Sequence, residues 1–127
     1  MTAIASTLDP RAKDVFTLDF TAQLNPGETL ASIVGIAVTA VRGTDPNAGA
    51  FVATTPAPAI NTAPVTVNSS TVSGVLQPSV TVATGCCIQG AMGGGLDGTW
   101  YEIVGIAQST NAQRVLTCKL IVPVSSS

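Results

Sequence analysis

Residues 100–124 read WYEIVGIAQSTNAQRVLTCKLIVPV, and this stretch decides the fold class. Two runs rich in β-branched residues, 100–107 and 114–124, flank a polar segment, which is the pattern of two strands joined by a turn. One face of the second run is apolar at every other position: Leu116, Cys118, Leu120 and Val122. This alternation predicts a half-buried strand and makes Cys118 a small buried hydrophobe.

Strand signals also occupy the N-terminal half. Over residues 15–20 large apolar groups alternate with smaller or polar ones, so Phe16, Leu18 and Phe20 share a face. The next segment, Asn25-Pro26-Gly27-Glu28, has Pro second and Gly third, as in a type II turn. Two further β-branched or apolar runs predict strands, at residues 29–41 and 86–92.

The middle of the chain, residues 42–85, has a different character. It holds five of the eight prolines and only brief apolar runs, at 65–67, 72–75 and 80–83. Proline confines such runs to sheet edges or breaks them. Two interpretations stand side by side: a surface excursion of short β segments with partial mobility, or a segment that carries a partner contact.

Together these patterns predict one all-β domain, an immunoglobulin-like β-sandwich of roughly seven to nine strands with a long Pro-rich excursion in the middle. A length of 127 residues suits a single domain. We expect an N-terminal arm over 1–12, the sandwich over 13–124 with its insertion at 42–85, and a polar tail over 125–127.

Composition narrows the function. Charged residues make up 9% of the chain, the formal net charge is −2 and histidine is absent. Nucleic acid and anionic lipid are therefore not expected partners, and acid–base or metal chemistry has few groups to use. A surface so poor in charge suits a protomer packed among copies of itself or other proteins, because few ions are desolvated at the contact. We therefore expect no enzyme activity and no cofactor.

No targeting or membrane-spanning segment is evident from the sequence. The longest apolar stretch, 30–41, is twelve residues long, whereas a spanning helix needs about 20. The first ten residues lack the basic and apolar regions of a signal peptide. The three cysteines, two adjacent and one distant, have no zinc-binding spacing. We predict that Cys86, Cys87 and Cys118 are reduced and at least partly buried.

Motifs that could carry chemistry are weak. The triple glycine 93–95 lacks the Lys and Ser or Thr of a phosphate loop and the repeats of a calcium-binding array, so we expect a flexible turn. Without histidine, and with no lysine at a recognised spacing from a serine, nucleophilic catalysis is not supported. The carboxylates of Asp9, Asp14 and Asp19 are expected to cap turns.

A better structural signal is Asp97-Gly98-Thr99-Trp100-Tyr101-Glu102-Ile103. It matches the tyrosine corner of immunoglobulin-like domains, where a Tyr near the start of a late strand bonds back to nearby backbone. An ordinary aromatic strand start is the alternative. Trp100, on the opposite face, is either outer-face packing or an interface anchor.

Taken in order, several of these motifs resemble the small immunoglobulin-like fibre–tail adaptor proteins of tailed bacteriophages. That family begins with an Asp-Pro lead-in, an aromatic-x-Asp-aromatic strand and a Pro-Gly-Glu turn. The matching residues in the first part of the chain are Asp9, Pro10, Phe16, Asp19, Phe20, Pro26, Gly27 and Glu28, followed by Thr29 to Ser32. In the second half they are Gly93 to Gly95, Tyr101, Ser109, Thr110, Arg114 and Val124. Residues 42–85 depart from the pattern.

The resemblance implies a non-enzymatic virion protein, made in the host cytoplasm, that links tail or baseplate to fibres by symmetric assembly. Its partners would be further copies and other virion proteins. A capsid or neck decoration protein would share the fold and surface. A carbohydrate-binding β-sandwich would need exposed aromatics, for which Trp100 and Tyr101 are the clustered pair.

Overall fold

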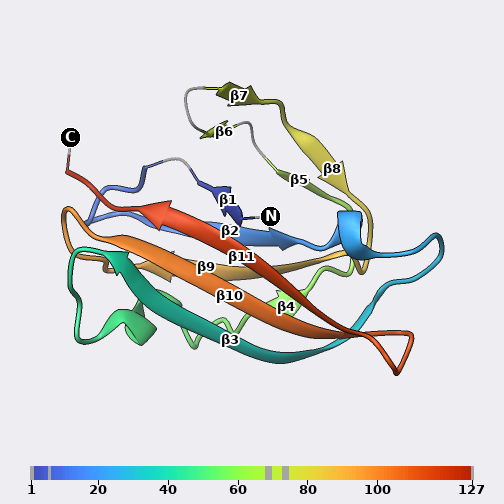
Figure 1. Ribbon diagram of the computed structural model, residues 1–127. Helices are drawn as coiled ribbons and strands as arrows, with labels where there is room; N and C mark the ends of the chain where they lie inside the picture. The colour runs from blue at the N-terminus through green and yellow to red at the C-terminus, as the bar shows by residue number, and fades with distance from the viewer. Residues whose placement is uncertain (1, 6, 68–69, 73–74, 127) are drawn as a thin grey trace.

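The structure, a computed structural model, describes residues 2–5, 7–67, 70–72 and 75–126, which form an all-β protein (Figure 1). The described residues contain eleven strands, more than the seven to nine expected, because several have only two or three residues. The strands are β1 Thr2–Ile4, β2 Lys13–Asp19, β3 Leu30–Arg42, β4 Ala59–Ile60, β5 Val65–Val67, β6 Ser70–Val72, β7 Val75–Gln77, β8 Val80–Val82, β9 Cys87–Gly93, β10 Trp100–Ser109 and β11 Val115–Pro123. Two short 3₁₀ helices, η1 Thr21–Gln23 and η2 Ala48–Phe51, complete the elements.

The larger sheet has the order β1-β11-β10-β3. Strands β10 and β11 form the antiparallel pair predicted from residues 100–124, with Ile103 opposite Leu120. Strand β3 runs antiparallel to β10 and lies at the edge of the sheet. Both long strands were expected from their β-branched content, and their positions agree with the sequence within two residues.

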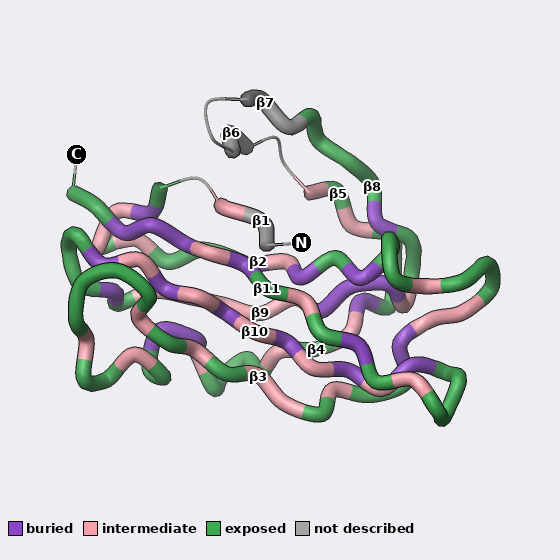
Figure 2. The backbone as a smooth tube through the Cα atoms, in the orientation of Figure 1, coloured by how far each residue is buried: buried purple, intermediate pink, exposed green. Residues whose placement is uncertain are grey.

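The second sheet has the order β2-β9-β4 and packs against the first. A Cβ added at Gly105 of β10 would lie 2.5 Å from Leu18 of β2, which shows how closely the sheets approach. Phe16, Leu18 and Phe20 are all buried, as their alternation predicts. Buried and half-buried positions alternate along β10 (Figure 2). The core between the sheets is made of Leu8, Phe16, Leu18, Phe20, Leu30, Phe51, Val52, Ile88, Met92, Tyr101, Ile103, Ala107, Leu116, Leu120, Val122 and Val124.

The ends of the chain are integrated into the sheet. Residues 1–12 were expected to form an arm, but β1 pairs in parallel with β11, and Leu8 is buried beside Val124. The polar tail is also held in place, because the Asp97 carboxylate accepts hydrogen bonds from the backbone N–H and hydroxyl of Ser126. The backbone of the N-terminal segment bonds to β11, and the N–H groups of Ser125 and Ser126 bond to Leu8 and Asp97.

The insertion at 42–85 has two parts that behave differently. Its first part, 43–61, belongs to the body: Phe51 and Val52 enter the core, and Ala53 and β4 extend the second sheet along β9. The expectation of a surface excursion is therefore wrong for this part, since large apolar side chains carried by a loop still lower their free energy by burial.

The second part, 62–85, forms a projection made of the pairs β5–β8 and β6–β7 (Figure 1). Of the predicted run 72–75, Val72 ends β6 and Val75 begins β7, while residues 73 and 74 lie outside the described part. Val82 seals the base of the projection together with Cys86 and Cys87. The Asn61 side chain also holds this base, because it accepts from Cys86 and Cys87 N–H and donates to two carbonyls.

Within the described residues, no helix is long and apolar enough to cross a membrane.

Candidate functional site

Tyr101 joins three separate segments at one end of the molecule. Its hydroxyl accepts a hydrogen bond from the Leu96 N–H at 2.9 Å and donates one to the Asp45 carboxylate at 2.6 Å. Its ring stacks on Phe51, with centroids 4.1 Å apart and the planes 4° from parallel. The bond back to the backbone is the one expected from the sequence. The carboxylate that completes the arrangement comes from the insertion, and Asp97 instead binds Ser126.

The glycine turn beside this tyrosine is packed. A Cβ at Gly95 would lie 2.9 Å from both Tyr101 and Val124, so this position has no room for a side chain. The turn is therefore packed against the core at Gly95, while Gly94 adopts the left-handed φ of +73° that glycine tolerates and has open space around it. Burial, together with the hydrogen bond to Asp45, raises the pKa of Tyr101 above its ordinary value.

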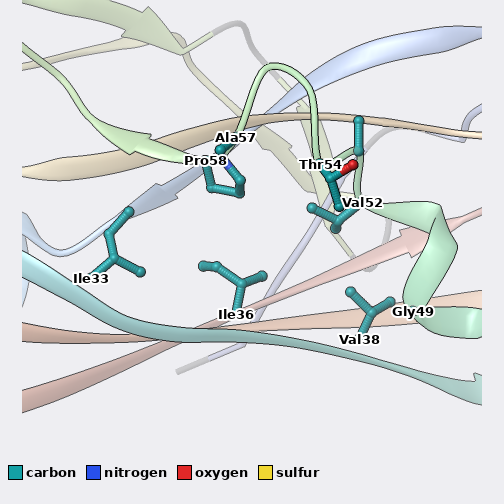
Figure 3. A pocket seen from close by; sticks show the side chains of 9 residues that line it. Ile33, Ile36, Val38, Gly49, Val52, Thr54, Ala57 and Pro58 are labelled. Atoms are coloured by element: carbon teal, nitrogen blue, oxygen red, sulfur yellow. The ribbon is translucent and has the colours of Figure 1, made fainter.

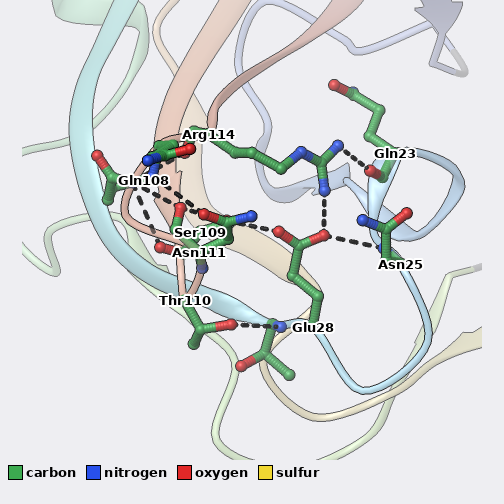
Figure 4. Close-up of polar contacts among 10 residues, drawn as sticks. Gln23, Asn25, Glu28, Gln108, Ser109, Thr110, Asn111 and Arg114 are labelled. Carbon is green, nitrogen blue, oxygen red and sulfur yellow. Dashed lines mark hydrogen bonds and ion pairs between the residues drawn. The ribbon is translucent and has the colours of Figure 1, made fainter.

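A polar network at the opposite end joins the two halves of the chain (Figure 4). Glu28 forms an ion pair with Arg114, and its other carboxylate oxygen accepts from the Ser109 hydroxyl at 2.7 Å. The Thr110 hydroxyl accepts from the Thr29 N–H, and the Thr29 carbonyl accepts from the Thr110 N–H. Arg114 also donates to the Gln23 carbonyl at 2.7 Å. Two loops distant in sequence are thus fastened to each other.

Glu28 occupies the last position of the turn predicted at 25–28. Gly27 has φ +80°, and the Glu28 N–H donates to the Asn25 carbonyl, which confirms the type II turn. The Glu28 carboxylate in turn accepts from the Asn25 N–H at 2.9 Å. This bond, the one from Ser109 and the Arg114 charge hold the pKa of Glu28 below its ordinary value. The carboxylate remains ionised because every neighbour favours its charge.

The three aspartates expected to cap turns, and the remaining residues quoted for the first part of the resemblance, have structural roles. Asp9 accepts from the Arg11 N–H, Asp14 from the Val15 N–H, and Asp19 from both the N–H and hydroxyl of Thr21. The contacts of Asp9 and Asp19 cap turns, as expected, whereas Asp14 lies within β2 and bonds the N–H of the next residue of that strand. Phe16 and Phe20 are core residues, and Pro10 is half-buried beside the buried Leu8.

Trp100 is half-buried on the outer face of the larger sheet. The Arg42 guanidinium lies 4.1 Å from the centre of its ring, a cation–π contact between β10 and β3. Tyr101, its sequence neighbour, is fully buried. The two aromatics therefore do not form a joint exposed platform, which removes the feature that suggested carbohydrate binding.

One surface feature was not predicted from the sequence: a groove beside the edge strand β3. An apolar groove of about 350 Å³ lies between β3 and the loop after η2 (Figure 3). Its walls are Ile33, Ile36, Val38, Gly49, Val52, Ala53, Thr54, Ala57 and Pro58. The sequence could not reveal it, because which strand lies at an edge depends on the order of strands in the sheet.

The three cysteines are free thiols in the structure, with Cys86 and Cys87 buried and Cys118 half-buried on the face shared with Leu116 and Leu120. Burial raises the pKa of Cys87 to about 11 and raises those of the other two, so thiolate is scarce near neutral pH. Within the described part of the chain, no group of three or more His, Cys, Asp or Glu is placed to hold a metal ion.

Comparison of the chain with protein-family models, with curated proteins and with solved structures finds no match.

Proposed function

We propose that the chain is a non-enzymatic structural protein of a bacteriophage virion, an immunoglobulin-like adaptor that links tail or baseplate to fibres. The observation that carries the proposal is the meeting of its two sets of motif residues. The Pro-Gly-Glu turn comes from the first part of the chain and the Ser109, Thr110 and Arg114 set from the last.

These sets are separated by the whole insertion, yet Glu28 contacts Ser109 and Arg114, and Thr29 contacts Thr110. A resemblance built from isolated short motifs is weak when its residues are scattered in the fold. Here the motif residues interact with one another in a single network. This contact supports treating them as one motif, and so supports the resemblance to the adaptor family. The network itself fastens loops and leaves the outer faces of the sheets for partners.

The immunoglobulin-like assignment draws support from two features. Two sheets share one core, as in a sandwich. Tyr101 lies near the start of β10, the second-to-last strand, and its hydroxyl is bonded to the backbone five residues earlier. In the immunoglobulin fold a tyrosine in this position fixes the corner before a late strand.

Low charge supports an assembly role over a freely diffusing one. The exposed apolar side chains include Val15, Val34, Val41 and Val115, which lie on strands of both sheets. Contacts through such surfaces desolvate few ions, so identical copies can associate around a symmetric tail. The projection 62–85, whose base is sealed by Val82, is the segment that we assign to a second virion partner.

A decoration protein of the capsid or neck is the second candidate, because the same neutral surface and fold would serve it. The two differ in where the chain attaches to the virion.

Immunogold labelling would locate that attachment site. Virions of a phage that encodes this chain, with an epitope added after Ser127, would be labelled with antibody-bound gold. The adaptor role predicts label at the fibre end of the tail, and label on the capsid or neck would favour decoration. Absence of the chain from purified virions would refute both.

A trimmed projection tests the partner contact. Replacing residues 68–79 by Asn-Gly joins Val67 to its paired residue Val80 through a two-residue hairpin turn and leaves Val82 and Asn61 in place. This variant should fold, as circular dichroism can verify, but should be missing from tails. Thr117→Lys, an exposed change on strand β11 outside the projection, is the control and should be incorporated. Equal incorporation of both variants would place the contact elsewhere.

A further inference from the structure

The free side of β3 is a long sheet edge. Strand β3 has thirteen residues, and its one neighbour in the sheet is β10. Among the described residues, the backbone of 31–41 makes no hydrogen bond beyond this ladder. Along an antiparallel edge half of the N–H and C=O groups point outward, so β3 presents a row of donors and acceptors to solvent.

The middle of this edge is straight enough to pair. Its register against β10 runs without a shift from Gly35 to Ala40, and bulges at Val34 and Val41 lie on either side. Bulges, prolines and charges are the usual protection of an exposed edge. Residues 35–40 contain none of these, and the first charge after them is Arg42.

The apolar groove lies directly below the same edge. Ile36 and Val38 line it from β3, opposite Val52 and Pro58 of the loop. Because side chains alternate along a strand, Gly35, Ala37 and Thr39 lie on the outer face. A strand added to β3 would therefore place every second side chain over the groove and the others on the outer face.

We propose that the occupant of this edge is β3 of a second copy, paired antiparallel about a two-fold axis at Ala37. In this register Ile36 faces the partner's Val38, Gly35 faces the partner's Thr39, and Ala37 faces its own equivalent. Opposed residues share a face, as antiparallel pairing requires, and no charged residue of the straight stretch opposes another. Two four-stranded sheets become one continuous sheet.

A second copy fits this edge better than an unrelated strand for a geometric reason. A two-fold contact uses the same patch on both copies, so one pairing closes every β3 edge in the assembly. Pairing β3 with a different strand would close one β3 edge for each contact made, whereas the two-fold pairing closes two. This inference rests on the proposed function, which includes association of identical copies.

Oppositely charged variants at one position test both the edge and the register. Ala37 is exposed on the outer face, so Ala37→Lys and Ala37→Glu should leave the fold intact. Each variant alone places two like charges against each other across the axis and should weaken dimerisation by roughly tenfold or more, measured by sedimentation equilibrium of the purified chain. An equimolar mixture should recover dimers, because lysine then faces glutamate. Thr117→Lys is the control and should dimerise as the native chain does.

A native chain that stays monomeric at all concentrations would overturn the proposal. So would equal weakening by Ala37→Lys and Thr117→Lys, since the effect would then come from net charge. Failure of the mixture to recover dimers would show that position 37 does not face itself. These readouts use the purified chain alone, so they can fail while the chain is found on tails, and the reverse.

Discussion

Replacing Tyr101 by phenylalanine removes one oxygen atom from a buried ring and breaks two hydrogen bonds. The ring should keep its stacking on Phe51 and its contact with Gly95, because neither involves the hydroxyl. The change therefore isolates the bonds to Asp45 and to the Leu96 N–H. From sequence alone one lost bond was expected, at about 1 kcal/mol.

The structure raises that expectation. A hydrogen bond to an ionised group is worth about 1.5–3 kcal/mol, and the bond of 2.6 Å to Asp45 is of this kind. Asp45 is half-buried and Leu96 is exposed, so in the variant water can form part of the hydrogen bonding that the Asp45 carboxylate and the Leu96 N–H lose. We therefore expect Tyr101→Phe to lower the free energy of unfolding by about 2 kcal/mol.

Urea denaturation at neutral pH, followed by tryptophan fluorescence, would measure this loss. A double-mutant cycle with Asp45→Asn separates the two bonds, because the single amide oxygen of asparagine can cap Asn47 while its NH₂ group, which cannot accept, replaces the carboxylate oxygen that binds the hydroxyl. In that background Tyr101→Phe should cost about 1 kcal/mol less. A loss below about 0.5 kcal/mol in the native background would refute the assigned bonds.

Three further predictions concern other parts of the molecule. The pKa of Glu28 is lowered in the folded protein, so its carboxylate stabilises the fold fully above the ordinary pKa of 4.5, and this contribution is lost as the pH falls through the lowered pKa. Glu28→Gln should therefore flatten the acid side of a plot of unfolding free energy against pH. Gly95→Ala brings a methyl group to 2.9 Å from Tyr101 and should cost about 1–3 kcal/mol in urea denaturation, whereas Gly49→Ala, with open space around it, should be nearly neutral; equal effects would contradict the packing. The thiol of Cys87 should react with iodoacetamide far more slowly in the folded protein than in urea, because burial raises its pKa to about 11, and rapid labelling detected by mass spectrometry would contradict this.

Local patterns gave several features correctly. The alternation at Phe16, Leu18 and Phe20, the turn at Asn25–Glu28 and the hydrogen bond of Tyr101 to nearby backbone all involve residues close in sequence. Such features depend on the period of side chains along a strand and on the φ values that each residue tolerates. Both are properties of a few neighbouring residues.

The insertion shows where local patterns fail. The prolines of residues 42–85 predicted a surface excursion. In the structure Phe51 and Val52 enter the core, and the Asp45 carboxylate accepts a hydrogen bond from Tyr101. A single apolar side chain in a loop has no period, so nothing nearby marks it as buried. Phe51 stacks on Tyr101, which lies at the start of β10 and is distant in sequence.

The sequence by itself determined that this protein is made of strands, which faces of the main strands are apolar and where the Pro-Gly turn lies, because each of these follows from neighbouring residues. Only the tertiary structure decided that Glu28 meets Arg114, that the first residues extend the sheet and that β3 lies at its edge. Strand order is set by how the apolar faces of all the strands together exclude water and satisfy their backbone hydrogen bonds. That balance belongs to the whole chain, and no short stretch of sequence contains it.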